Sequence, residues 1–312
     1  MSGINGWIIL DKPLGLGSTQ AVAAVKRNLR SAGYGKLKVG HGGTLDPLAT
    51  GVLPVALGEA TKLCGRMLDA SKIYDFTIHF GNETAGLDAE GEVVATSDVR
   101  PTLAQIQTIL PQFTGVIEQI PPAFSAIKID GKRAYDLARA GEAVQMKSRE
   151  VTIYSLRVSP PVDEHQITMQ GTGDAAELAE VRLTAHVSKG TYIRSLARDI
   201  AHAAGTVGHV TMLRRVKAGP FSLESAISLD KLNEIGEGAA ANDFILPFEA
   251  GLDDIPVLDL SPDAVMAVRQ GRVVTGIATD DGLYWARDAE MRPVAMIELF
   301  AGTLKIVRGF NI

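Results

Sequence analysis

The chain has 312 residues, 46% of them apolar and 21% charged, a composition typical of a soluble globular protein that buries a core without disulfides or a metal. Its single cysteine, Cys64, excludes an internal disulfide, suggests a reducing compartment, and is better interpreted as a small buried thiol than as a nucleophile. The net charge of −5 taken alone argues against a nucleic-acid partner, and the lack of a signal-like start or of about eighteen consecutive apolar residues predicts a cytoplasmic protein without a membrane helix.

The N-terminal part of the chain is basic. Residues 1–66 carry eight Lys/Arg and three Asp/Glu, a local balance of +5. Residues 6–10 predict a short buried strand and residues 11–17 a loop, after which Ser18 or Thr19 is expected to cap a helix that ends near the following glycines. Because the local field attracts a partner, this segment is a candidate RNA-binding surface, with an ordinary solvated face as the alternative.

The middle of the chain alternates strands with a few helices. Residues 72–80 alternate in polarity, with Tyr74 on the face of three apolar residues, which predicts a strand. The other elements expected here are a helix over 102–113, strands over 151–158 and 179–187, and a helix that ends at Gly205. Residues 181–222 are again basic, with seven Lys/Arg against Asp199 alone. Strands and helices in no strict alternation predict an α+β fold with a mixed or antiparallel sheet.

The composition of the sequence changes near residues 245–256, where prolines and a glycine interrupt an acidic stretch. Short strand-like runs separated by glycines follow, at 273–274, 283–285, 294–300 and 303–307. The sequence therefore predicts a main domain over residues 1–250 and a small β domain over residues 251–312.

The densest group of unusual residues lies at 40–54, where glycines surround His41 and where Asp46 precedes a proline. Glycine permits unusual dihedral angles and a close approach of the backbone to a ligand. Pro47 biases Asp46 toward an extended conformation, so the carboxylate is expected to project from a loop among apolar residues. A poorly solvated carboxylate is a candidate nucleophile or base. The alternative is an Asx-turn before the proline, which the local pattern taken alone favours.

Residues 42–53, Gly-Gly-Thr-Leu-Asp-Pro-Leu-Ala-Thr-Gly-Val-Leu, resemble the signature of the TruB family of tRNA pseudouridine synthases. Further segments resemble the other motifs of this family in the same order, at 10–15 (Leu-Asp-Lys-Pro-Leu-Gly), 72–74 (Lys-Ile-Tyr), 119–128, 188–196 and 213–221. The resemblance covers about residues 5–245, and ordered motifs are far more specific together than singly. It implies a pseudouridine synthase core with a central insertion at about 85–150, and the last segment resembles a PUA-like RNA-binding domain.

The resemblance implies an isomerase that converts uridine to pseudouridine. The bond from C1′ to N1 is broken, the base turns, and C5 is joined to C1′, so no cofactor is required. Asp46 matches the catalytic aspartate of the family, and Arg194 matches the arginine that keeps it ionised, although without Asp46 a surface ion pair is the better interpretation of Arg194. Tyr74 matches the tyrosine that stacks on the target base, although its apolar face is also typical of a core tyrosine.

Other side chains match the substrate-binding residues of the family. Tyr192 and Leu213 match residues of the uracil pocket, and His41 matches the histidine that inserts into the RNA loop when the base is flipped out. The candidates for contacts with RNA phosphates are Lys12, Lys26, Arg27, Lys36, Lys38, Arg214 and Arg215, with Lys62 and Arg66 as less specific additions. The spacing of the histidines predicts no metal site.

The sequence departs from the family pattern in several places. Gly17 stands where a hydroxyl residue is common, which puts a hydrogen bond of the first motif in doubt. Residues 84–88 lack the middle of the usual Thr-Asp-Thr-x-Asp pattern, so Asp88 is assigned no role beyond a turn. Residues 241–312 have a balance of −5, from six basic and eleven acidic side chains, which predicts few phosphate contacts in the C-terminal segment.

The family resemblance favours uridine 55 in the T loop of tRNA as the target, and a monomer that needs neither a guide RNA nor another protein. The first alternative is an RNA-binding or RNA-folding protein without turnover, which needs neither Asp46 nor Arg194. The second is a hydrolase, which needs a second carboxylate that the motifs do not supply. The third is a pseudouridine synthase with a different RNA target.

Overall fold

The computed structural model describes residues 4–142, 144–159, 169–170, 176–238 and 241–312. The chain divides into two compact units, each assembled from stretches that are distant in the sequence. The first unit comprises residues 1–45, 52–68 and 219–312, and the second comprises residues 46–51 and 69–218. This division does not follow the predicted boundary near residue 250, which stays a prediction. No helix in the described part of the chain is long and apolar enough to cross a membrane.

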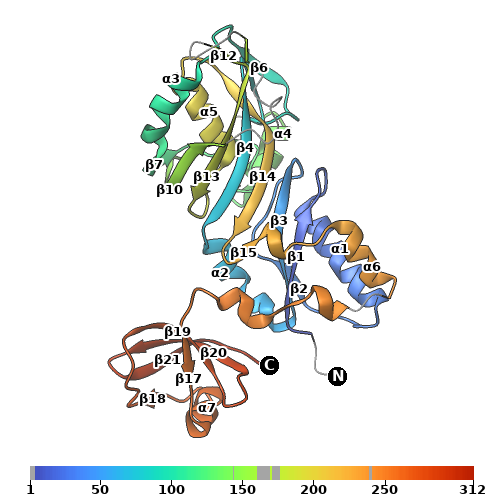
Figure 1. Ribbon diagram of the computed structural model, residues 1–312, viewed down its shortest axis with the longest axis vertical. Helices are drawn as coiled ribbons and strands as arrows, with labels where there is room; N and C mark the ends of the chain where they lie inside the picture. Colours follow the sequence, from blue (N-terminus) through green and yellow to red (C-terminus); the bar gives the residue numbers. More distant parts are fainter. Residues whose placement is uncertain (1–3, 143, 160–168, 171–175, 239–240) are drawn as a thin grey trace. The chain divides into compact units, whose positions relative to one another are not determined.

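The first unit contains a small sheet and two helices that pack against each other and against its central strand (Figure 1). The strands are β1 (Gly6–Lys12), β2 (Val39–His41), β3 (Ala49–Leu57), whose first residues belong to the second unit, and β16 (Leu246–Pro247). The two helices are α1 (Ser18–Ser31) and α6 (Leu229–Gly236). Shorter elements are η1 (Gly58–Leu63), α2 (Cys64–Asp69), β15 (Phe221–Ser222), η3 (Leu223–Ser225), η4 (Ala241–Phe244) and η5 (Phe248–Leu252).

The start of α1 differs from its prediction in a way that affects the site. The N-cap residue is Gly17, without a side-chain cap, so the predicted cap by Ser18 or Thr19 is wrong. Ser18 is buried, and its hydroxyl accepts from the backbone N–H of Leu45 (2.8 Å) and donates to the carbonyl of Leu45 (2.9 Å). The hydroxyl that a cap would use therefore fixes the residue immediately before Asp46.

The C-terminal part of the first unit is a five-stranded sheet with one helix. The strands, in the spatial order β17-β19-β20-β21-β18, are β17 (Val257–Asp259), β18 (Val274–Thr275), β19 (Gly282–Arg287), β20 (Pro293–Phe300) and β21 (Thr303–Gly309). Helix α7 (Pro262–Arg269) was not predicted, and it places Val265 and Val268 in a core with Ile297 and Leu299. The prediction of a separate β-rich segment at the end of the chain is confirmed.

The second unit is built on one long mixed sheet. Its strands are β4 (Lys72–Phe80), β7 (Gly115–Gln119), β10 (Arg149–Val158), β13 (Glu180–Val187) and β14 (Gly208–Ala218). They lie in the order β14-β4-β13-β10-β7 with antiparallel pairing, and residues 49–51 of β3 pair parallel to β14. Helix α5 (Ile193–Ala203) packs on β4 and β14, where Phe76 and Ile78 are fully buried (Figure 1). The predicted α+β fold with a mixed sheet is confirmed.

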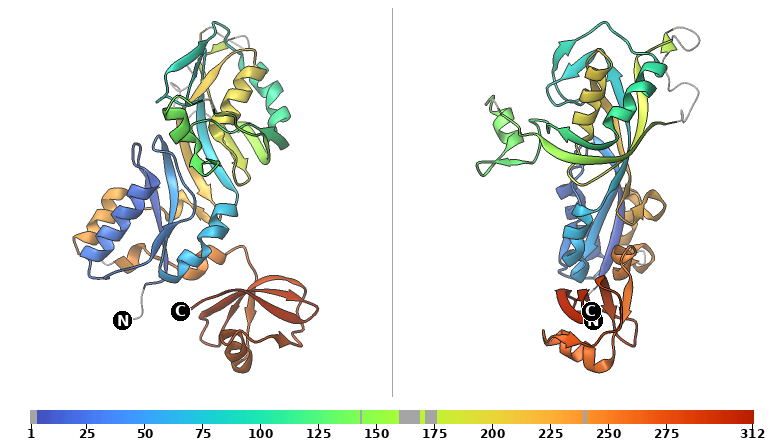
Figure 2. Two further views of the ribbon diagram at one scale, coloured as in Figure 1. Left: turned by 180° about the vertical axis from the view of Figure 1, so that it is seen from behind. Right: turned by 90° about the vertical axis from the view of Figure 1, so that its left-hand side faces the viewer.

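The remaining elements of the second unit connect these strands. They are β5 (Asn82–Thr84), β6 (Val93–Thr96), α3 (Leu103–Ile109), η2 (Leu110–Phe113), β8 (Lys128–Ile129), β9 (Lys132–Arg133), α4 (Ala134–Arg139), β11 (Met169–Gln170) and β12 (Glu177–Leu178). The segment that contains β8, β9 and α4, drawn in green, projects from the sheet in Figure 2. It lies within the predicted central insertion.

Most of the predicted strands agree with the structure, but β3 and β14 were missed. Strand β4 has the predicted bounds, and the predicted strands at 151–158 and 179–187 correspond to β10 and β13. In β3, Gly51 has a φ of 101°, and a Cβ atom there would lie 2.2 Å from the carbonyl oxygen of Arg215. The close approach of β14 therefore requires a glycine at this position of β3.

Candidate active site

The candidate site of the second unit is built around an ion pair between Asp46 and Arg194. Asp46 lies in a turn before β3, where its carbonyl accepts from the N–H of Ala49 (3.0 Å). Its Oδ2 atom lies 2.8 Å from Nη2 of Arg194, in the first turn of α5. The Asp46 side chain is 39% exposed, whereas that of Arg194 is only 6% exposed. A buried guanidinium thus holds a carboxylate that a substrate can reach.

The guanidinium of Arg194 is fixed by three further acceptors. Nη1 donates to the carbonyl of Gly86 (2.8 Å) and to Oδ2 of Asp88 (3.1 Å). Nη2 donates to the carbonyl of Phe124 (3.0 Å), in addition to its contact with Asp46. Only arginine offers a planar fork of donors to several acceptors at once, and its charge persists at any physiological pH. Arg194 is therefore a preorganised positive charge beside Asp46.

Asp88 also contacts Arg194, a contact that was not predicted from the sequence. The hydroxyl of Thr84 accepts from the N–H of Asp88 (3.0 Å) and donates to its carbonyl (2.6 Å), and Leu87 between them has a φ of 60°. Such a dihedral angle is rare for leucine and is common at functional sites. Burial raises the pKa of Asp88, and the charge of Arg194 opposes that rise. The sequence signal for this contact was the aspartate that ends the incomplete Thr-x-x-x-Asp pattern. In the structure, Asp88 forms a turn and also binds Arg194.

The two carboxylates on Arg194 differ in access. Asp88 is buried and satisfied by Arg194 and by the N–H of Glu90. Asp46 is the one that faces solvent, with 39% of its side chain exposed against 9% for Asp88. A hydrolase that uses two carboxylates needs a pair of accessible acids, and the two acids bound to Arg194 are not such a pair.

The sheet places Tyr74, Leu213 and Arg215 on the face covered by α5. Tyr74 pairs with Arg215 on β14, and Leu213 pairs with Phe76, so Tyr74 and Leu213 are diagonal neighbours. Tyr74 is half-buried, whereas Phe76 is completely buried. A tyrosine at the open end of an apolar row presents a ring surface to a ligand, which a core tyrosine does not.

Tyr192 is the N-cap residue of α5, two positions before Arg194. The guanidinium carbon of Arg149 lies 4.9 Å from the centre of the Tyr192 ring. The side-chain amide of Gln119 binds the backbone of Tyr192 on both its N–H and its carbonyl. The sequence analysis assigned no role to Gln119 or Arg149, because neither contact is visible in a local pattern.

Comparison with known proteins agrees with this geometry. Residues 30–193 match the TruB family pseudouridylate synthase N-terminal domain, and residues 194–253 match the tRNA pseudouridylate synthase B C-terminal domain. This chain belongs to the TruB family of pseudouridine synthases. The tRNA pseudouridine synthase B of Novosphingobium aromaticivorans is 65% identical over 99% of this chain and 98% of the relative, and that of Zymomonas mobilis is 53% identical over 99% and 96%. The predicted family is confirmed, and with it the assignment of an isomerase.

Solved structures support the TruB-type fold. A chain in an H/ACA ribonucleoprotein bound to a substrate RNA containing 2′-deoxyuridine matches with a TM-score of 0.71 and 25% identity, over 98% of this chain and 85% of the other. A chain in a Cbf5–Nop10–Gar1 complex matches with a TM-score of 0.66 and 27% identity, over 98% and 84%.

Two of the predicted phosphate contacts do not fit the structure of this TruB family member. Lys12 is 0% exposed, and its ammonium group donates to the carbonyls of Pro13 (3.0 Å) and Leu16 (2.6 Å). Arg215 is also buried, on the α5 face of the sheet. Because their charged groups are enclosed by protein, both predictions are corrected to structural roles.

The other predicted RNA-binding residues have accessible side chains. Lys26, Arg27, Lys36 and Lys38 are exposed in the first unit, so their phosphate contacts stay predictions. His41 is half-buried at the end of β2, where Nδ1 accepts from the N–H of Gly43 (3.3 Å). Lys62 and Arg66 form ion pairs with Glu59 and Asp254.

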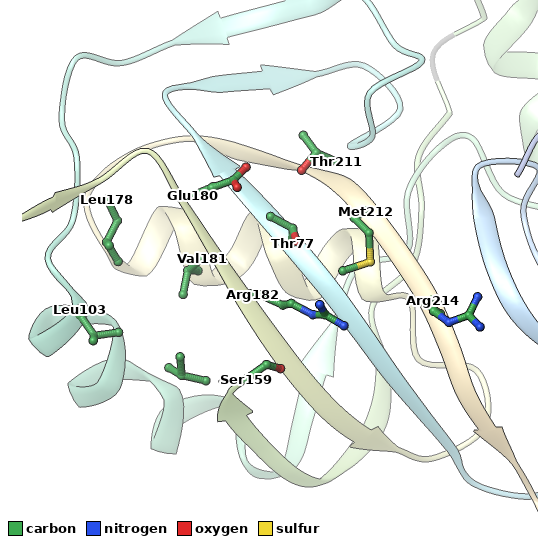
Figure 3. A pocket seen from close by; sticks show the side chains of 11 residues that line it. Thr77, Leu103, Ser159, Leu178, Glu180, Val181, Arg182, Thr211, Met212 and Arg214 are labelled. Carbon is green, nitrogen blue, oxygen red and sulfur yellow. The ribbon is translucent and has the colours of Figure 1, made fainter. Parts of the chain in front are cut away.

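Arg214 lies on the sheet face opposite to α5, because it pairs with Asp75 in the register between β14 and β4. It lines a hollow of about 370 Å³ together with Thr77, Arg182 and Met212 (Figure 3). A phosphate contact of Arg214 stays a prediction, and it belongs to a different surface from the Asp46–Arg194 pair. Within the described residues, no group of three His, Cys, Asp or Glu side chains is arranged to hold a metal ion.

Proposed function

We propose that this chain converts uridine 55 in the T loop of tRNA to pseudouridine, with Asp46 acting at the ribose. The curated relatives that match it over nearly the whole chain are named tRNA pseudouridine synthase B. The observation that carries the proposal is the half-exposed carboxylate of Asp46, held 2.8 Å from a guanidinium that is itself 6% exposed.

The proposed chemistry needs the ionised form of Asp46. The carboxylate acts beside C1′, either by attack on C1′ or by removal of the C2′ proton, and the bond between C1′ and N1 breaks. After the base has turned, C5 forms the new bond to C1′ while the bond from Asp46 to C1′ breaks or, in the other route, Asp46 returns the proton to C2′. C5 then loses its proton, and N1 is protonated. Atoms and electrons balance without a cofactor. The fixed charge of Arg194 stabilises the carboxylate without any rearrangement during the reaction.

The target base must leave the RNA loop to reach Asp46, at a cost of a few kcal/mol. Tyr74 offers a ring on which the uracil stacks, which contributes about 1–3 kcal/mol. Leu213 and Tyr192 complete the uracil pocket, and His41 fills the space that the base vacates. The exposed lysines and arginine of the first unit contact phosphates of the T arm. The enzyme acts in the cytoplasm as a monomer, without a guide RNA.

The test uses a transcribed T-arm stem-loop, incubated with the wild-type chain, with Asp46→Asn, or with the control Asp69→Asn. Asp69 is an exposed aspartate of the same unit, paired with Lys189 at 2.9 Å, so its substitution makes the same chemical change away from Arg194. Pseudouridine is mapped by chemical blocking and primer extension. Product at the T-loop uridine with the wild type and the control, and none with Asp46→Asn, is the expected result.

Other outcomes overturn parts of the proposal. Product from Asp46→Asn removes Asp46 from its role. RNA binding by the wild type without product identifies an RNA-binding or RNA-folding protein without turnover. Product only at a uridine outside the T loop shows a synthase with another target.

A further inference from the structure

A hydrogen-bonded clamp connects the end of β7 to the start of α5. Gln119, the last residue of β7, is 1% exposed, and its Oε1 accepts from the N–H of Tyr192 (2.8 Å). Its Nε2 donates to the carbonyl of the same residue (3.2 Å). One amide side chain thus satisfies both backbone groups of a single residue that lies 73 positions away.

The neighbouring strand contacts the same tyrosine from its ring side. Arg149 is the direct cross-strand partner of Gln119 in the pairing of β7 with β10. Its guanidinium carbon lies 4.9 Å from the centre of the Tyr192 ring, and Nη2 donates to the carbonyl of Gly190. Two paired residues at one end of a β ribbon therefore hold the backbone and the ring of Tyr192.

The clamp acts at the end of α5 that has no side-chain cap. Tyr192 is the N-cap residue of α5, and no side chain of its own caps the helix. The next residue after Gln119, Ile120, also binds this turn, because its carbonyl accepts from the hydroxyl of Ser195 (2.8 Å). The end of β7 therefore contacts the first turn of α5, which carries Arg194, at both Tyr192 and Ser195.

We propose that Gln119 and Arg149 are positioning residues that hold Tyr192, and through the first turn of α5 also Arg194, in the geometry that isomerisation requires. This inference rests on the proposed function, in which Tyr192 lines the uracil pocket. Gln119 is buried, so it acts through Tyr192 and has no contact with the RNA. A displacement of about 1 Å at such a position costs up to about a hundredfold in rate, which makes the clamp measurable.

The chemistry of the amide provides a specific test. In Gln119→Glu, one carboxylate oxygen still accepts from the N–H of Tyr192, but the other faces the carbonyl of Tyr192 and has no proton to donate. Protonation restores a donor in the same place, and burial raises the pKa of such a carboxyl group. The defect of Gln119→Glu must therefore shrink as the pH falls. Gln119→Ala loses both bonds at every pH and has no such rescue.

The experiment measures single-turnover rate constants and KM on the T-arm stem-loop between pH 6 and pH 8.5. For Gln119→Glu, we expect a rate about tenfold below wild type at pH 8.5, recovery to within about threefold at pH 6, and a KM within about twofold of wild type. Gln119→Ala should show a constant rate ratio to wild type over the same range. Gln107→Glu, on the exposed face of α3, is the matched control and should follow the wild type.

Arg149→Lys tests the ring side of the clamp without a buried change. It keeps the positive charge but loses the planar stack on Tyr192, and we expect a threefold to fivefold lower rate at unchanged KM. Wild-type rates for Gln119→Glu at pH 8.5, a defect that does not depend on pH, or a wild-type rate for Arg149→Lys would overturn the clamp. Failure of the wild-type chain to make pseudouridine would instead overturn the proposed function.

Discussion

Two of the Arg–Asp pairs in the second unit are of nearly equal length and lie on opposite faces of one sheet. Arg194 and Asp46 are 2.8 Å apart on the α5 face. Arg182 and Asp75 are 2.9 Å apart on the other face, where Arg182 lines the hollow in Figure 3. Distance alone does not distinguish the two pairs.

The partners of each carboxylate do distinguish them. Both oxygens of Asp75 are bound by protein, Oδ2 by Arg182 and Oδ1 by the hydroxyl of Thr184 (2.7 Å). The side chains of Arg182 and Asp75 are similarly exposed, at 22% and 21%. In the other pair the guanidinium is enclosed by four acceptors, and the carboxylate is left open. A saturated pair stabilises a fold, whereas an open carboxylate on a fixed charge is suited to catalysis.

The largest expected difference in rate constant is between the variants Arg194→Lys and Arg182→Lys. A lysine has one nitrogen and does not reach the acceptors that Arg194 joins, so we expect about a hundredfold loss of rate constant and a loss of about 2 kcal/mol in the free energy of unfolding. Arg182→Lys keeps one contact with Asp75, so the rate should stay within about twofold of wild type. Single-turnover assays and urea unfolding measure both, and equal losses of rate would contradict the comparison.

A smaller difference is expected between Asp88→Asn and Asp75→Asn. Asparagine still accepts from Arg194 but removes one of its two anionic partners, so the rate should fall about tenfold while the T-arm affinity is unchanged. Asp75→Asn should lower the free energy of unfolding by about 1 kcal/mol and leave the rate unchanged. A rate defect in Asp75→Asn, with none in Asp88→Asn, would reverse the assignment of the two faces.

The last prediction concerns stability alone. Lys72 is a further buried cation of this unit, and its ammonium group donates to the carbonyl of Ala70 (2.6 Å). Burial, and to a smaller extent the positive charge of Arg215, lowers the pKa of Lys72 from 10.5 to about 8. Between about pH 8 and pH 10.5 the Lys72 side chain is protonated in the unfolded chain but mostly neutral in the folded chain. This group therefore destabilises the fold below pH 8, and its cost disappears as the pH rises toward 10.5.

Lys72→Met removes this titration. The free energy of unfolding of the wild type, relative to that of Lys72→Met, should increase by about 2 kcal/mol between pH 7.5 and pH 10, as measured by urea unfolding. Parallel stability curves for the two proteins would show that burial does not perturb Lys72.

The sequence predicted the elements whose pattern is local. The alternation over residues 72–80 predicted β4 with its observed bounds, and apolar spacing predicted the helices that became α1 and α5. Strand β3 was missed because Gly51 and Pro54 are typical of loops, and only the neighbouring backbone of β14 explains the glycine. Prediction from a local pattern fails where the residue type is required by a neighbour that is remote in the chain.

The candidate site shows the same limit. The motifs identified Asp46, Arg194 and Tyr74, because their residue types and order are specific to the family. Asp88 was assigned no role beyond a turn because its motif was incomplete. Gln119 belongs to a segment that resembles a family motif, but no role was assigned to it. Lys12 was taken for a surface charge, but backbone carbonyls enclose its ammonium group.

By itself, the sequence determined the family and the α+β class and singled out Asp46 as the candidate reactive carboxylate, since these depend on ordered local motifs. Only the tertiary structure decided which charges are enclosed, which carboxylate is open, and which side chains hold Arg194 and Tyr192. Those properties arise from hydrogen bonds and burial between segments as far apart as Gly86, Phe124 and Arg194, and no local pattern records such contacts.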